Sequence, residues 1–234
     1  MATQDEKIEY AIERTEVIRL PKHSLTTFGT TNIYYYLVTE PVYAELVGRE
    51  KETVVRDGKV IAERPRIVTP SYLANLFRGF EHGREYVEYI LQRYGPHEPG
   101  LLYNYRNEPR EINIVTSPLG TVVANLNEKI DRQGDPLSAI IKGVDEMWDV
   151  SLMKFIHDMT RDSVGRNVLE LAGSGLLDID RGGIPRDARN RIEELFQQVK
   201  RGELDPSELK VELDRWGLFR EYEDRFLSLF RKRT

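Results

Sequence analysis

The feature that most constrains the fold is a long run of apolar residues at helical spacing between Pro136 and Ala172. Its main stripe recurs every three or four residues and consists of Ile141, Val144, Trp148, Leu152, Phe155 and Met159. Residues at this spacing share one side of an α-helix, because each residue turns the helix by about 100°. A second apolar line, from Met147 to Ile156, lies on another side. We therefore predict a long central helix that is buried on more than one face.

The composition favours a soluble protein of the cytoplasm. A chain of 234 residues can bury a sizeable core without crosslinks. It contains no cysteine, which excludes disulfides and thiolate metal sites and is typical of a reducing compartment. No apolar run approaches the roughly 18 residues of a membrane span, and the first ten residues are acidic where a signal peptide would be basic. We expect no membrane association.

The net charge of −5 is not spread evenly along the chain. Residues 128–180 contain 11 acidic and 6 basic residues, so the central helix and its flanks carry the whole surplus. Such a region could attract a cation or a basic partner, although a solvated acidic face is the commoner reason for a charge bias of this size.

Short strands and helices alternate in the first half of the chain. Thr3 and Glu6 have the spacing of a capping box at the start of a helix over 3–14. Aromatic and β-branched residues at 32–39 are typical of a strand. Asp57-Gly58 between two apolar runs is typical of a two-residue hairpin turn. The remaining predicted elements of this half are hairpin strands at 52–56 and 59–63, helices at 70–79 and 81–94, and strands at 101–106 and 111–116 joined by a turn at 107–109.

The second half is predicted to be almost purely helical. Besides the central helix, helices are expected at 119–130, 185–201, 206–216 and 219–230. Asp205-Pro206 is a strong helix start, because the aspartate caps free amides and proline misses no donor at the first position. We predict an α+β fold, with a mixed part at 1–117 containing antiparallel hairpins and two helices, and a helical part at 118–234. The two parts could also form one continuous domain.

Two aspartates of the central helix are candidate metal ligands. Asp145 and Asp149 are four residues apart and would share one helix face, where like charges repel and call for a nearby cation. The simpler interpretation is an arginine from another helix. The alternative is a divalent metal with oxygen ligands.

His157-Asp158 resembles the paired His-Asp of the HD-domain metal-dependent phosphohydrolases. His82 and His97 precede this pair and Asp162, Asp178 and Asp180 follow it, in the order H, HD, D that holds one or two metals in that family. The resemblance covers this dipeptide and the residue order, not a domain. It implies that His157 and Asp158 are metal ligands in a hydrolase of phosphate esters. The helical spacing instead places His157 about 180° from the main apolar stripe, which favours a surface histidine near Arg161.

The segment RGGIPRDAR, residues 181–189, is a candidate anion site. Arg186 and Arg189 lie in the first turns of a predicted helix, where the helix dipole disfavours positive charge, and no capping side chain precedes Pro185. A phosphate held by free amides and by Arg181, Arg186 or Arg189 would resolve both features. The acidic neighbours Asp178, Asp180 and Asp187 could resolve them without a ligand.

Three functions remain open. The leading hypothesis is a non-catalytic cytoplasmic protein for interaction or assembly, which binds a protein partner or associates with itself. It is favoured by abundant tyrosine and arginine and by the lack of a strong catalytic motif, and it requires no cofactor. The alternative is a metal-dependent hydrolase of a phosphate ester. A nucleic-acid binder that uses Tyr34-Tyr35-Tyr36 comes third and is disfavoured, because residues 1–68 are slightly acidic.

Overall fold

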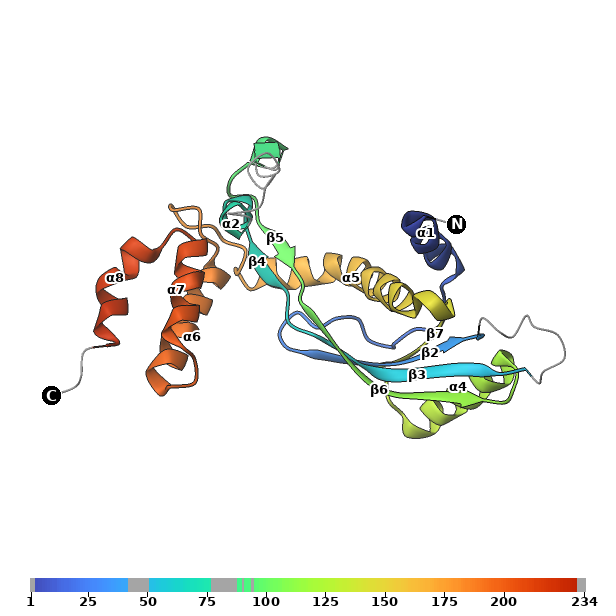
Figure 1. The fold of residues 1–234 in the computed structure, drawn as a ribbon. Helices are drawn as coiled ribbons and strands as arrows, with labels where there is room; N and C mark the ends of the chain where they lie inside the picture. Colours follow the sequence, from blue (N-terminus) through green and yellow to red (C-terminus); the bar gives the residue numbers. More distant parts are fainter. Residues whose placement is uncertain (1–2, 42–50, 77–87, 90, 94, 231–234) are drawn as a thin grey trace. The chain divides into compact units, whose positions relative to one another are not determined.

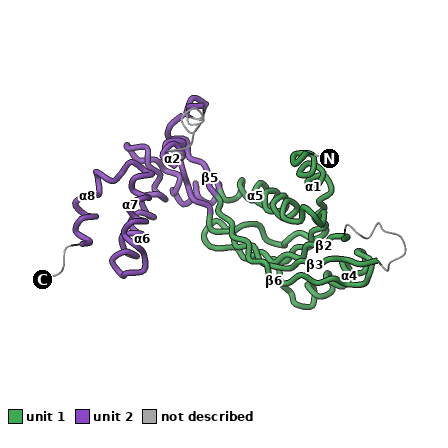
Figure 2. The backbone as a smooth tube through the Cα atoms, viewed as in Figure 1, with its two compact units in different colours: residues 1–64, 103–167 green, residues 65–102, 168–234 purple. Residues whose placement is uncertain are grey.

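The computed structural model describes residues 3–41, 51–76, 88–89, 91–93 and 95–230 (Figure 1). The α+β fold agrees with the prediction. The chain forms two compact units, and each is assembled from two separate stretches: residues 1–64 with 103–167, and residues 65–102 with 168–234 (Figure 2). The division into parts at 1–117 and 118–234 stays a prediction. No described helix is long and apolar enough to cross a membrane.

The first unit is built on a mixed five-stranded sheet. Its strands lie in the order β1-β7-β2-β3-β6, in which β2 and β7 are parallel and the other neighbours antiparallel. The strands are β1 (Glu16–Arg19), β2 (Thr31–Thr39), β3 (Thr53–Ala62), β6 (Tyr105–Val115) and β7 (Ser138–Lys142). The strand predicted at 32–39 is therefore confirmed, and it occupies the centre of the sheet.

Helices cover both faces of this sheet (Figure 1). On one face, α5 (Trp148–Gly173) buries Leu152, Phe155 and Met159 against residues of β2, β3 and β7. On the other face, α4 (Leu119–Gln133) buries Val122, Leu126 and Ile130. The first helix, α1 (Gln4–Arg14), begins with the predicted capping box of Thr3 and Glu6.

The central helix begins twelve residues later than its apolar pattern predicts. Residues 138–142 form β7, where Ile140 and Ile141 are fully buried, and a 3₁₀ turn (η2, Asp145–Met147) leads into α5 at Trp148. The predicted start was wrong because a short apolar run fits a buried strand as well as a helix, and β2 offers this segment a parallel partner. From Trp148 onward the predicted helix and its main buried stripe are confirmed. Burial of the whole second apolar line was wrong, because Met153 is 57% exposed.

Asp57-Gly58 does not form a hairpin turn; it lies inside β3. These two residues pair with Tyr36 and Tyr35 of β2, and the pairing of β3 with β6 is irregular between Arg56 and Gly58. The Tyr35 side chain lies across Gly58, and its hydroxyl donates a hydrogen bond to Asn107 Oδ1 at 3.1 Å. Burial raises the pKa of Tyr35 above its usual value. The glycine thus makes room for an aromatic ring rather than for a turn.

Gly58→Ala is expected to lower the free energy of unfolding by about 1–3 kcal/mol, the usual cost of overpacking. A Cβ at this position would lie 2.5 Å from the Tyr35 hydroxyl oxygen and 2.9 Å from the backbone oxygen of Glu108. Urea unfolding measures the effect. Gly120→Ala in α4 is the matched control, because the space around Gly120 is open, and it should be neutral or slightly stabilising. An equal effect of both substitutions would contradict the close contact.

The turn predicted at Asn107-Glu108-Pro109 is also absent, because these residues lie within β6. Pro109 pairs with Gly58 of β3 at the edge of the sheet, where a missing amide donor on the outer side costs little. Residues 105–115 therefore form one strand of eleven residues, which includes the end of the first predicted strand, the predicted turn and most of the second predicted strand.

The second unit combines a two-stranded sheet with helices. Its elements are β4 (Arg66–Val68), α2 (Pro70–Leu76), β5 (Gly100–Leu102), α6 (Arg186–Arg201), α7 (Pro206–Arg215) and α8 (Phe219–Ser228). The core is centred on Phe196, Leu209, Leu213 and Trp216. Asp205 caps α7 as predicted, since its side chain accepts a hydrogen bond from the Ser207 amide. Most of the helix predicted at 81–94, and Gly79 before it, lie outside the described residues.

Candidate functional site

The outer side of β6 is a long edge of the sheet. β6 pairs with β3 on its inner side, and among the described residues no strand pairs with its outer side. An edge strand of this length presents a row of backbone donors and acceptors that another strand can use. Its first half contains Pro109, which cannot donate, whereas residues 111–115 contain no proline and no lysine.

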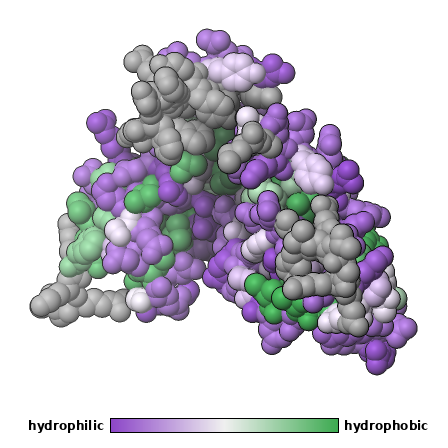
Figure 3. All heavy atoms as spheres, turned by 45° about the vertical axis from the view of Figure 1, so that its right-hand side comes forward, coloured by the Kyte–Doolittle hydropathy of each residue, from purple (hydrophilic) through white to green (hydrophobic). Residues whose placement is uncertain are grey.

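The second half of β6 exposes two isoleucines side by side. Ile112 is 68% exposed and Ile114 is 61% exposed. Both side chains lie on the α5 face of the sheet, because Ile112 pairs with Arg56, whose guanidinium contacts Trp148 of α5. Exposed apolar residues beside an unpaired strand edge are typical of a protein-binding surface. Figure 3 shows hydrophobic patches within a largely hydrophilic surface on the face that it displays.

A groove of about 470 Å³ lies on the other face of the same edge. Its walls come from β6 and α4. Asn113 and Val115 line it from the strand, Leu126 and Lys129 line it from the helix, and Ile114 lies at its border. The Lys129 ammonium lies 5.0 Å from the centre of the Tyr36 ring, which also lines the groove. The edge at residues 111–115 is thus flanked by apolar side chains on one face and by a partly polar groove on the other.

The tyrosine run is divided between core and surface contacts. Tyr35 is buried, while Tyr34 and Tyr36 lie on the opposite face of β2 beneath Arg110 and Lys129. Their rings are therefore in contact with cations of the chain itself. Nucleic-acid binding by this run stays a prediction.

The structure separates the predicted metal ligands into two pairs. Asp145 lies in η2, where its Oδ1 accepts hydrogen bonds from Thr39 at 2.7 Å and from Arg56 at 2.8 Å. Asp149 is exposed in the first turn of α5. The cation expected near Asp145 is thus an arginine, although it comes from a strand and not from a helix.

His157 and Asp158 lie further along α5, and the His157 side chain is 74% exposed. Lys154 pairs with Asp158 at 2.7 Å, and its hydrogen bond lowers the pKa of that carboxyl. Within the ranges that the structure describes, no three or more His, Asp or Glu residues are grouped so that they could hold a metal ion. Metal binding at these four residues stays a prediction.

The chain's own carboxylates accompany the predicted anion-binding arginines. Arg189 pairs with Asp180 at 2.8 Å and with Glu221 at 2.6 Å, Arg186 pairs with Asp178 at 3.0 Å, and Arg181 is exposed. Asp180 also accepts hydrogen bonds from the amides of Gly182 and Ile184. Partial burial raises the pKa of Asp180, but these amides and Arg189 outweigh burial and lower it overall. This geometry supports the interpretation without a ligand, and anion binding stays a prediction.

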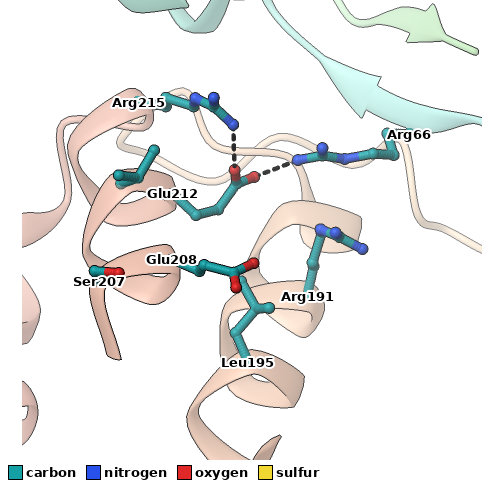
Figure 4. Close-up of a pocket in the computed structure, with 8 residues that line it drawn as sticks. Arg66, Arg191, Leu195, Ser207, Glu208, Glu212 and Arg215 are labelled. Carbon is teal, nitrogen blue, oxygen red and sulfur yellow. Dashed lines mark hydrogen bonds and ion pairs between the residues drawn. The ribbon is translucent and has the colours of Figure 1, made fainter. Parts of the chain in front are cut away.

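A second pocket, of about 320 Å³, surrounds a buried carboxylate in the second unit (Figure 4). Glu212 of α7 is only 4% exposed, and Arg66 of β4 pairs with it at 2.5 Å. Tyr72 and Trp216 donate further hydrogen bonds to the carboxylate at 3.2 and 3.3 Å. Burial, followed by the charge of Glu212, raises the pKa of Tyr72. Because the carboxylate is held by these donors, we interpret the cluster as structural.

Sequence reasoning missed Ile112, Ile114 and Glu212. Ile112-Asn113-Ile114 alternates as an exposed strand does, and Glu212 interrupts the apolar spacing of Leu209, Leu213 and Trp216 on α7. Both patterns are visible in the sequence, but neither identifies a binding partner. Comparison of the chain with protein-family models, curated proteins and solved structures found no match.

Proposed function

We propose that this is a non-catalytic interaction or assembly protein that binds an extended segment along residues 111–115 of β6. The observation that carries the proposal is the combination of an outer edge that no described strand pairs with and the exposed side chains of Ile112 and Ile114. A segment that adds to a sheet edge gains backbone hydrogen bonds along its length, and alternate side chains then contact the two faces of the sheet. Here one face offers the isoleucines and the other the groove beside α4.

Short peptides selected from a display library on the immobilised full chain should be extended and should alternate apolar residues. Their affinity should fall at least about tenfold for the double variant Ile112→Thr, Ile114→Lys, since each buried isoleucine contributes about 1.5–3 kcal/mol. Threonine at position 112 keeps a β-branched side chain and avoids a second cation opposite Arg56.

Leu169→Lys is the matched control, because Leu169 is also an exposed apolar residue, at 74%, and is not part of β6. It should leave peptide affinity unchanged, and both variants should keep the melting temperature of the parent. Equal peptide binding by the parent and the double variant would refute the proposed surface.

A further inference from the structure

We propose that the segment bound by β6 is the β6 of a second copy of this chain, antiparallel to the first and centred on Asn113. This inference rests on the proposed function, because it requires the same outer edge to accept a strand. The proposed assembly is a symmetric homodimer, in which both copies use the same surface patch.

The register follows from which residues would lie opposite each other. In an antiparallel pair centred on residue 113, Ile112 of each copy lies opposite Ile114 of the other, and Glu111 lies opposite Val115. All four exposed isoleucines then contact one another. A pair centred on Arg110 or Glu111 would instead place like charges opposite each other, which is destabilising.

The same register also fits the length of the strand. β6 ends at Val115, so a ladder centred on Asn113 spans residues 111–115 of both copies. Pro109 would lie opposite Ser117, beyond the end of the strand, and its missing amide does not interrupt the ladder. The half of β6 that lacks proline is thus also the half whose apolar residues are self-complementary and whose pairing places no like charges opposite each other.

Sedimentation equilibrium of the full chain over a range of concentrations tests whether the partner is a second copy. The apparent mass should rise toward twice the 27.2 kDa of one chain. Ile112→Thr with Ile114→Lys should return the mass to that of one chain, and Leu169→Lys should leave the dimer intact. A single-chain mass at every concentration would overturn the homodimer.

Cysteine crosslinking tests the register, because the chain has no cysteine of its own. Asn113→Cys places two thiols opposite each other on the twofold axis, at a Cβ separation of about 4.5–5.5 Å that can close to a disulfide. Oxidation should therefore give a covalent dimer. Glu111→Cys is the control: its two copies would be roughly 13 Å apart along the strands, and it should not crosslink. Crosslinking at position 111 but not at 113 would overturn the register.

The binding surface on β6 and the identity of its partner can be refuted separately. If the chain is a monomer but the selected peptides still bind and the double variant abolishes their binding, the edge is a binding surface and the second copy is wrong. If neither peptides nor a second copy bind, the proposed function itself fails.

Discussion

Glu212→Ala is expected to lower the free energy of unfolding of the second unit by about 3–5 kcal/mol, as removal of one partner from a buried ion pair does. The substitution leaves Arg66 buried without its carboxylate, and it also removes the acceptor of the Trp216 indole and the Tyr72 hydroxyl. Each unsatisfied buried donor adds its desolvation cost. The loss should exceed that of an ordinary surface substitution several-fold.

Urea unfolding followed by the fluorescence of Trp216 measures this effect, in a Trp148→Phe background that removes the chain's other tryptophan. Glu208→Ala is the matched control, because Glu208 is an exposed glutamate one turn earlier on α7 and lines the same pocket. It should change the stability by less than about 0.5 kcal/mol. Similar values for the two variants would show that the buried carboxylate does not stabilise this unit.

Phe155→Ala should destabilise the first unit by about 3–5 kcal/mol, because it removes a large apolar side chain and leaves a cavity. Phe155 is fully buried between α5 and the sheet, among residues of β2, β3 and β7. Met153→Ala on the same helix is the control, since Met153 is exposed and its truncation creates no cavity. Urea unfolding followed by circular dichroism gives both values. A small loss at position 155 would contradict the central packing of α5.

Elements with strong local signals were predictable from the sequence. The capping box of α1 and the aspartate cap of α7 each satisfy free backbone groups through neighbours in the chain. The α5 face from Trp148 onward was predictable because its 3.6-residue period persists over several turns.

Elements decided by distant partners were not predictable. Asp57-Gly58 has the composition of a turn, but Tyr35 and β6 fix it in a continuous strand. Ile140 and Ile141 extend a helical pattern in the sequence, yet they pair with the parallel strand β2 and belong to the sheet. In both places tertiary pairing overrides local preference.

The candidate surface was less accessible to sequence reasoning than the fold. A cation near Asp145 was predictable from the neighbouring charge of Asp149, but its source was not, because Arg56 belongs to a strand far away in sequence. The alternation around Ile112 and Ile114 indicates a strand, but only the position of that strand at the edge of the sheet shows that the two isoleucines are exposed.

Amide hydrogen exchange of residues 111–115 at low and high protein concentration tests the β6 surface most directly. If this edge pairs with another strand, its outward amides should exchange several-fold more slowly as concentration rises, while the amides of α8 keep their rates. Exchange at 111–115 that is equally fast at every concentration, with or without a selected peptide, would contradict β6 as the interaction surface.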